Sequence, residues 1–331
     1  MQRRFTSAHE RLLLLLSLLE QVPKISIVTV NYNNGKYLEE AMLSVLNQNY
    51  PNLEYIVIDG GSTDNSIDII KKYEHRLAYW VSEKDEGQYH AVQKGFDKST
   101  GEIMAWINSD DLYVPNAFSA VAEIFHTFPD VSWLMGIPRE YTPQGVMISR
   151  ITLPWGRWSK HRFYMYDFQF IQQESSFWKR SLWEAAGSRI DTDFKYAGDM
   201  ELWTRFFRHQ KLHTTLATLA GFRHRSDAQR SVEFRGQYLL ECKTAIDREL
   251  SAMPFLKRLS YTLLKPVGLV TAPFFFYDIP FFNAFFPWWF GIPKPIGYDV
   301  ANKKYIRQSL LVKLPPLFLF KRQVHRKMFK E

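Results

Sequence analysis

Short β-branched runs alternate with amphipathic stretches in the N-terminal third of the chain. The runs at Ile25–Val30 and Glu54–Asp59 predict buried strands, and each is followed by a polar turn and then apolar residues at helical spacing. The same reading predicts helices at 37–48, 67–73 and 88–98, and further strands at 78–81 and 103–107. Strands alternating with helices predict an α/β fold with a mostly parallel sheet, which binds ligands beyond the carboxyl ends of its strands.

Carboxylates stand at two of these predicted strand ends. Asp59 ends the second strand, and Asp110 and Asp111 follow the fourth. Side chains alternate in extended chain, so one Asp of the pair can face a metal while the other faces a neighbouring hydroxyl. Mg²⁺ and Mn²⁺ suit such a pair, because hard cations use few protein oxygens and complete their shell with water and phosphate. The alternative is a solvated turn whose Asp caps a helix starting at Pro115.

Composition and charge narrow the classes of protein. The chain has 331 residues, enough for one large α/β domain with an appendage, and its single cysteine, Cys242, excludes an intramolecular disulfide and a zinc site built on cysteines. Of the net charge of +8, residues 251–331 contribute +10, from 13 Lys and Arg against 3 Asp and Glu, so the first 250 residues carry −2. A basic tail on a slightly acidic module does not favour nucleic-acid binding.

The N-terminal segment, residues 1–23, carries a leucine run bracketed by Glu10, Arg11 and Glu20. The run is too short to span a bilayer, and no small-residue cleavage site follows it. We expect a short amphipathic or packing helix, with a targeting signal as the alternative.

The C-terminal segment, residues 251–331, combines aromatic clusters with basic flanks. Phe274–Tyr277 and Trp288–Phe290 lie in a stretch with four regularly spaced prolines, which argue against one continuous transmembrane helix. Lys and Arg on both sides favour an anionic lipid surface, and Trp and Tyr favour its headgroup level. We expect attachment to the cytoplasmic face of the cell membrane, peripheral or monotopic. The alternative is a packing arm or a homo-oligomer interface.

Five motifs, in this order, resemble family 2 glycosyltransferases with the GT-A fold: Thr29–Asn33, Val57–Ser66, Glu83–Gly87, Gly101–Asp111 and Gly198–Trp203. The resemblance covers residues 24–225, and we expect the GT-A domain to span 24–250. It implies an inverting transfer of a sugar from a nucleotide diphosphate donor, with Mn²⁺ or Mg²⁺ as cofactor.

The resemblance also implies roles for individual residues. Asp111 would hold the metal, and Asp110 would share it or face the ribose of the nucleotide. Asp199, at the start of a predicted helix with Leu202, Phe206 and Phe207 on its buried side, matches the catalytic base that takes the acceptor's proton; the alternative is a helix cap.

Further residues are expected to bind the nucleotide sugar, namely Thr29, Asn31, Asn33, Asp59 and Asp64. Asn31 to Asn33 and Asp59 would read uracil or a similar base, whereas Asp64 could equally cap the helix at Ile67. Gly60 stands where some relatives carry a second acidic residue, which leaves the base contact open.

Three other stretches have two interpretations each. Glu83, Asp85 and Lys94 border the nucleotide site or form a salt-bridged surface, and Arg223–Arg225 binds the diphosphate or is a solvated strand end. The alternating polar and aromatic residues of 168–178 predict a strand that serves as a sugar platform or an ordinary sheet strand, and 213–220 predicts another strand.

The sequence thus predicts a metal-dependent inverting glycosyltransferase of surface polysaccharide or glycolipid assembly. The processive Gln-x-x-Arg-Trp motif is absent, so we expect addition of a single sugar, from a UDP-linked donor, to a lipid-linked or saccharide acceptor. The alternatives are a catalytically silent homologue that scaffolds a membrane assembly and a nucleotidyltransferase. The turn at Asn31–Gly35 lacks the Gly-rich, Lys- or Arg-bearing phosphate loop expected of the latter.

Overall fold

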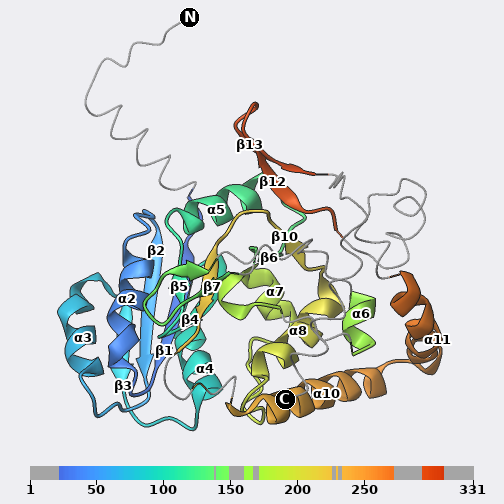
Figure 1. Cartoon of the computed structure of the whole chain (residues 1–331), viewed down its shortest axis with the longest axis horizontal. Helices are drawn as coiled ribbons and strands as arrows, with labels where there is room; N and C mark the ends of the chain where they lie inside the picture. The colour runs from blue at the N-terminus through green and yellow to red at the C-terminus, as the bar shows by residue number, and fades with distance from the viewer. Residues whose placement is uncertain are drawn as a thin grey trace, which may run out of the picture.

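A seven-stranded sheet forms the centre of the molecule (Figure 1). The computed structural model describes residues 22–137, 139–148, 160–166, 171–225, 229, 233–271 and 293–308. The expected N-terminal helix, the aromatic clusters of 274–290 and the end of the chain from 309 lie outside the described residues.

The sheet has a parallel half and a mixed half. In order across it lie β3 (Tyr79–Ser82), β2 (Leu53–Asp59), β1 (Ile25–Asn31), β4 (Ile103–Asn108), β9 (Ser176–Lys179), β6 (Trp133–Met135) and β10 (His213–Thr214). The first four are parallel, whereas β9 is antiparallel to both of its neighbours. The predicted mostly parallel sheet, with helices between its strands, is confirmed.

Helices cover both faces of this sheet. On one face lie α2 (Gly35–Leu46), α3 (Ser66–Tyr73) and α5 (Ala117–Thr127); on the other lie α4 (Gln88–Lys98), α7 (Arg180–Ala185) and α8 (Gly198–His209). Along β1, Ile25 and Ile27 face the first layer and Val28 and Val30 face the second. Both faces of the strand are buried, and this is why its sequence is apolar throughout.

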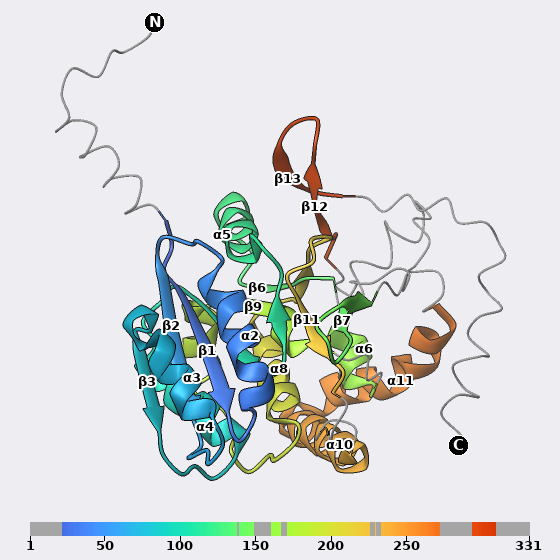
Figure 2. The ribbon, with the colours of Figure 1, turned by 60° about the vertical axis from the view of Figure 1, so that its left-hand side comes forward.

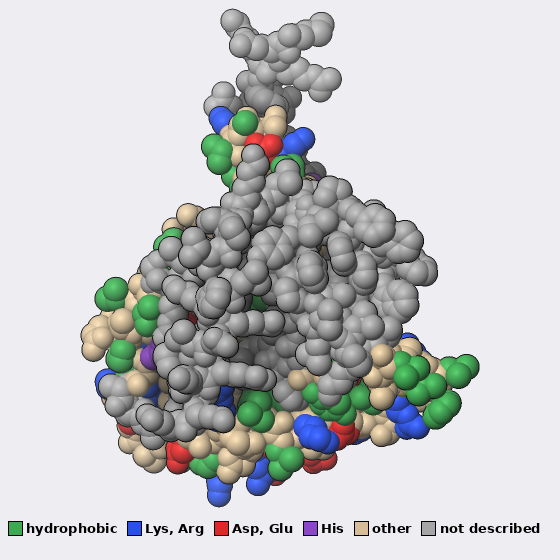
Figure 3. Space-filling model, turned by 45° about the vertical axis from the view of Figure 1, so that its right-hand side comes forward, with side chains coloured by type: hydrophobic (Ala, Val, Ile, Leu, Met, Phe, Trp, Pro, Cys, Tyr) green, Lys and Arg blue, Asp and Glu red, His purple; other side chains and the backbone are tan. Residues whose placement is uncertain are grey.

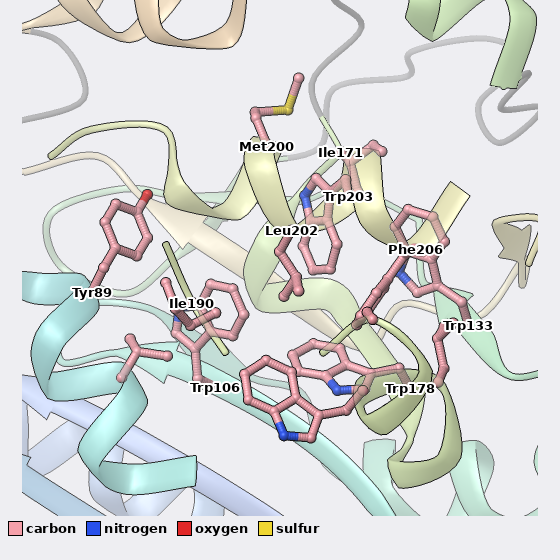
Figure 4. Close-up of a cluster of buried hydrophobic side chains, with 14 of the residues drawn as sticks. Tyr89, Trp106, Trp133, Ile171, Trp178, Ile190, Met200, Leu202, Trp203 and Phe206 are labelled. Atoms are coloured by element: carbon pink, nitrogen blue, oxygen red, sulfur yellow. The ribbon is translucent and has the colours of Figure 1, made fainter. Parts of the chain in front are cut away.

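Tryptophans fill the core beneath α8. The ring of Trp203 stacks on Trp106 and Trp133, with centroids 6.0 Å and 5.1 Å apart, and Trp178 meets Trp203 edge-on at 5.8 Å (Figure 4). All four side chains are fully buried. Large aromatic surfaces contribute strongly to burial, so this cluster fixes the start of α8 against the sheet.

Smaller elements complete the fold. A four-stranded sheet contains β5 (Leu112–Tyr113), β11 (Ala220–Arg223), β7 (Glu140–Tyr141) and β8 (Met147–Ile148), and the remaining helices are α6 (Lys160–Tyr164), α10 (Arg235–Ala252) and α11 (Phe255–Thr271). The hairpin of β12 (Ile296–Asp299) and β13 (Lys304–Arg307) projects beyond α5 (Figure 2). Its Ile296 and Tyr305 are buried in the same core as α5. The boundary at residue 250 stays a prediction.

Two predicted strands differ from the structure. Residues 168–170 lie outside the described part, and Gln173–Ser175 form a 3₁₀ turn, so only Ser176–Lys179 are extended. Residues 213–220 form no single strand, because the chain leaves the central sheet after Thr214 and joins the second sheet at Ala220. Polar and aromatic alternation alone does not distinguish these turns from continuous strands.

Within the part of the chain that the structure describes, no helix is both long enough and apolar enough to cross a membrane.

Candidate functional site

A pocket of about 610 Å³ opens at the carboxyl ends of the parallel strands. Its walls come from the ends of β1, β2 and β4, from the loop between β3 and α4, and from the segment after β11. The volume falls within the range of roughly 300–1,000 Å³ typical of small-molecule sites. The expected ligand crevice at this edge is therefore present.

Asp110 is the carboxylate that reaches the pocket wall. Its side chain is 15% exposed, and its Oδ2 lies 3.5 Å from Nη1 of Arg225, which also lines the pocket. Burial raises the pKa of Asp110, while the charge of Arg225 works against this rise. A desolvated carboxylate beside an Arg suits a ligand that brings phosphate and a cation.

Asp111 points away from the pocket and is buried. Its Oδ1 accepts a hydrogen bond from the backbone N–H of Arg223 at 2.9 Å, and its Oδ2 accepts one from Nδ2 of Asn108 at 3.2 Å. Burial, followed by the nearby charge of Asp110, raises the pKa of Asp111. Asp111 does not line the pocket, in contrast to the metal-holding position expected from the sequence.

Asp59 ends β2 at the same edge of the sheet, but its side chain is fully buried and both of its oxygens already accept hydrogen bonds. Its two oxygens accept hydrogen bonds from the side chains of Asn31, Ser62 and Ser82, at 2.7, 2.5 and 2.6 Å. Two backbone N–H groups, of Gly61 and Ser62, add 3.1 and 2.8 Å bonds. Asp59 therefore shapes the turn after β2, and it is Asn31 that lines the pocket.

The other residues expected to bind the nucleotide sugar, namely Thr29, Asn33 and Asp64, instead make hydrogen bonds within the sheet and the loops. The Oγ1 of Thr29 accepts a hydrogen bond from Tyr55 inside the sheet. Asn33 has a positive φ of 46°, and its Oδ1 accepts the N–H of Thr63. The carboxylate of Asp64 accepts the N–H groups of Gly35 at 2.8 Å and Ser66 at 3.0 Å, where α2 and α3 begin. None of the three lines the pocket.

The loop between β3 and α4 brings a different acidic residue to the pocket. Asp85 lines it together with Lys84, whereas Glu83 forms an exposed ion pair with Lys94 at 2.8 Å. The oxygen Oδ1 of Asp85 accepts the backbone N–H of Gly87 at 2.9 Å. Of the three residues with two interpretations, only Asp85 borders the pocket.

Asp199 lies in the first turn of α8, which begins at Gly198 after the N-cap residue Ala197. Asp199 is therefore not the N-cap residue, and its Oδ1 accepts a hydrogen bond from the hydroxyl of Tyr89 on α4 at 3.1 Å. The expected burial of Leu202, Phe206 and Phe207 is confirmed. Burial raises the pKa of Asp199 to about 6, which suits a group that must both hold and release a proton near neutral pH.

Glu174 is a site residue that the sequence analysis missed. It is 4% exposed, and its Oε1 has no hydrogen-bond partner among the described residues. Burial first, and then the charges of Asp110 and Asp199, raise its pKa to about 8. Glu174 therefore lies within electrostatic range of both carboxylates, and the hydrogen bond from Tyr89 places Asp199 next to Gln88, which lines the pocket. The sequence feature that could have identified Glu174 is that it is the only charged residue in the segment 168–178.

Arg223 and Arg225 take different places. Arg223 is buried, with Nη2 2.7 Å from the Glu40 carboxylate, and both guanidinium groups lie over the ring of Tyr37, at 5.1 and 5.5 Å. Only Arg225 lines the pocket. A guanidinium there can bind phosphate oxygens with two parallel hydrogen bonds.

The fit of a divalent cation depends on Asp110. Among the described residues, no group of three or more His, Cys, Asp or Glu side chains could hold a metal. Mg²⁺ and Mn²⁺ commonly bind through one or two carboxylates and take their remaining ligands from substrate phosphates and water. One carboxylate on the wall of a pocket that also carries Arg225 fits this pattern.

Comparisons with known proteins agree with this geometry. The profile of the family described as "Glycosyl transferase family 2" matches residues 26–183. An uncharacterized glycosyltransferase of Mycobacterium tuberculosis is 30% identical over 55% of this chain and 68% of its own length, and one of Nostoc is 36% identical over 31% and 33%. The chain thus spans one third to two thirds of these curated relatives.

A solved structure supports the fold. Staphylococcus aureus TarS, residues 1–349 in complex with UDP-GlcNAc, superposes with a TM-score of 0.57 and 16% identity, over 71% of this chain and 69% of that one. This likeness confirms the GT-A fold class.

Proposed function

The chain belongs to glycosyl transferase family 2, and we propose that it transfers a single sugar, with inversion, from a nucleotide diphosphate sugar to a lipid-linked or saccharide acceptor. One observation carries the proposal: Asp199 on α8 accepts a hydrogen bond from Tyr89, which directly follows the pocket residue Gln88 on α4, so a carboxylate with a raised pKa lies beside the pocket whose wall carries Asp110. The complex of TarS with UDP-GlcNAc, a protein of the same fold, supports a nucleotide sugar as donor.

In this proposal the pocket holds the nucleotide diphosphate. Asp110 would hold Mg²⁺ or Mn²⁺, and Arg225, whose guanidinium lies beside Asp110, would bind the diphosphate. When bound, the cation acts as a Lewis acid that stabilises the negative charge of the departing diphosphate. Asp110 takes the metal-holding role that the sequence assigned to Asp111, because only Asp110 borders the pocket.

Asp199 acts on the acceptor. A hydroxyl of the acceptor attacks the anomeric carbon on the face opposite the diphosphate, so that the new glycosidic C–O bond forms as the bond to the phosphate oxygen breaks. The acceptor's proton passes to the carboxylate of Asp199, while Tyr89 keeps that carboxylate oriented by its hydrogen bond. Glu174 stays protonated below its pKa of about 8 and so adds no negative charge there.

A donor screen tests the proposal. Release of nucleoside diphosphate should be measured for a panel of nucleotide sugars, with Mn²⁺, with Mg²⁺ and with a chelator. We expect one class of nucleotide sugar to support turnover. This turnover should require Mn²⁺ or Mg²⁺ and an intact Asp199. Turnover that is equal in Asp199→Asn would contradict the assignment of the base.

We also propose that the C-terminal part attaches the enzyme to an anionic membrane surface, as the composition of 251–331 predicted. On α11, Leu256, Leu259 and Leu263 recur at helical spacing and are 78, 37 and 65% exposed, while Tyr261 on the opposite face is buried. Lys257 and Arg258 stand beside this stripe. In Figure 3 hydrophobic and basic side chains lie together at the lower right of the surface, with acidic ones further along the lower edge.

Vesicle flotation of the full chain tests this attachment. We expect binding to anionic vesicles, little binding to neutral ones, and a loss of binding in the double variant Leu256→Ser, Leu263→Ser. Leu240→Ser on α10, which removes a leucine that is 65% exposed elsewhere, is the matched control. Unchanged flotation of the double variant, or a change of oligomeric state instead, would count against the lipid surface.

A further inference from the structure

A glycine follows Asp59 at the pocket wall, and a second loop places a carboxylate against it. Gly60 lines the pocket, and a Cβ built on it would lie 2.6 Å from Oδ2 of Asp85. The Asp85 carboxylate thus occupies the space that a side chain at position 60 would need. Gly60 and Asp85 form a complementary pair from two different loops.

Asp59 is poorly placed to contact a ligand in the pocket. It is fully buried, it does not line the pocket, and its oxygens already accept five hydrogen bonds. Asp85 differs, because Oδ1 accepts the N–H of Gly87 whereas Oδ2 has no hydrogen-bond partner among the described residues. One carboxylate oxygen beside the strand ends is therefore available to a ligand.

We propose that Asp85 reads the base of the donor, accepting a hydrogen bond from a ring N–H, and that the donor is a uridine diphosphate sugar. This inference rests on the proposed function. Uracil presents a single ring donor, N3–H, between two carbonyl groups, which suits one available carboxylate oxygen. Cytosine presents an unprotonated N3 at the same position, and its lone pair repels a carboxylate. Guanine presents two adjacent donors, which suit a carboxylate with both oxygens available.

The neighbouring residues fit this arrangement. Tyr32, next to Asn31 on the pocket wall, is 65% exposed, so its ring is available to stack on a flat base. Arg225 and Asp110 line the part of the pocket formed after β11 and β4, where the diphosphate is proposed to lie. A base near Asp85 and a diphosphate near Asp110 place the nucleotide along the strand ends.

Calorimetric titration of the full chain with UDP, CDP and GDP in the presence of Mg²⁺ tests the assignment. We expect the wild type to prefer UDP. Asp85→Asn should weaken UDP binding by about tenfold and strengthen CDP binding, because the amide can donate to N3 of cytosine. Glu86→Gln, which removes an exposed carboxylate one residue away and outside the pocket lining, should leave both affinities unchanged.

A rescue variant separates base reading from damage to the loop. Asp85→Ala should lose the preference for UDP, and the double variant Gly60→Asp, Asp85→Ala should regain it, because the new carboxylate enters the space vacated by Asp85. The φ angle of Gly60 lies outside the range that L residues avoid, so this substitution adds no backbone strain. Gly60→Asp alone should weaken binding through the clash with Asp85.

The outcomes distinguish this inference from the proposed function. Nucleoside diphosphates that bind without preference, a preference for CDP or GDP, or an unchanged preference in Asp85→Asn would overturn the role of Asp85 and leave the glycosyl transfer standing. If the wild type bound no nucleoside diphosphate at all, both would fall.

Discussion

Replacing Tyr89 with Phe should shift the acid limb of the transfer rate, because Tyr89 supports the ionised form of Asp199. The Tyr89 hydroxyl lies 3.1 Å from Oδ1 of Asp199 and 3.0 Å from the carbonyl oxygen of Tyr196, so one proton serves two acceptors. Burial raises the pKa of Asp199 to about 6, and hydrogen bonds to the carboxylate, including that from Tyr89, limit the rise.

The size of the effect follows from this geometry. A hydrogen bond to a charged group contributes about 1.5–3 kcal/mol, and sharing of the proton reduces this to roughly half. Because one pKa unit corresponds to about 1.4 kcal/mol, the acid midpoint should move upward by roughly 0.5–1 pH unit. At pH 6 the ionised fraction of Asp199 then falls from about one half to roughly one tenth to one quarter, whereas at pH 8 it stays above about nine tenths.

The assay is the initial rate of transfer at saturating donor, measured from acid to mildly alkaline pH. Tyr89→Phe keeps the ring that packs on Gly198, where a Cβ would come within 2.8 Å of it, so the fold should be retained. Tyr73→Phe is the control, because Tyr73 also donates to a carboxylate, that of Glu39, on the opposite face of the sheet. An unchanged midpoint in Tyr89→Phe would refute the reasoning.

Four further substitutions test the same site. Asp199→Asn should stabilise the fold at pH 8 by up to about 3 kcal/mol, the free energy that corresponds to the gap between 3.8 and about 6. Because the pKa of Asp199 is higher in the folded state than in the unfolded state, the wild type loses stability as the pH rises from about 4 to about 6. The stability gained by Asp199→Asn should therefore vanish near pH 4, as measured by urea unfolding. Asp110→Asn should abolish the stimulation of turnover by Mn²⁺ or Mg²⁺, whereas Asp111→Asn should retain it, because its side chain lies outside the pocket and an amide oxygen can still accept the N–H of Arg223. Glu174→Gln should keep transfer at pH 7 and remove a decline above pH 8, where ionised Glu174 would repel the anionic substrate.

Local pattern predicted most of the fold correctly, because the strands of the parallel half are buried on both faces and their helices are amphipathic. The strand β1 and the helix α2 differ from their predicted bounds by only a few residues. The segment around Gln173–Ser175 was harder, since its 3₁₀ turn is set by contacts with elements far along the chain rather than by its own spacing. Glu174 was missed for the same reason.

The candidate site was predictable as a set of strand ends but not residue by residue. As alternation along an extended chain predicted, the side chains of Asp110 and Asp111 point in different directions. However, β4 already ends at Asn108. Both Asp residues lie in the turn that follows, so strand register does not predict which of the two faces the pocket. The hydrogen bond from Arg223 to Asp111 spans 112 positions in sequence, so no local signal identifies the inward side chain. Asp59 shows the same limit, because its partners come from the ends of β1 and β3 and from the loop after β2.

The division of labour between the two carboxylates explains why they are adjacent. By binding the backbone N–H of Arg223, Asp111 holds β11 beside β5, where Gly221 pairs with Leu112. This pairing brings Arg225, two residues after Arg223, beside Asp110 on the pocket wall. Asp111 therefore holds the pocket wall in position, and Asp110 presents its carboxylate to the ligand. It follows that the proposed cation site depends on the docking of β11 as much as on Asp110 itself, and that a substitution which loosens β11 should weaken diphosphate binding without touching a residue of the pocket.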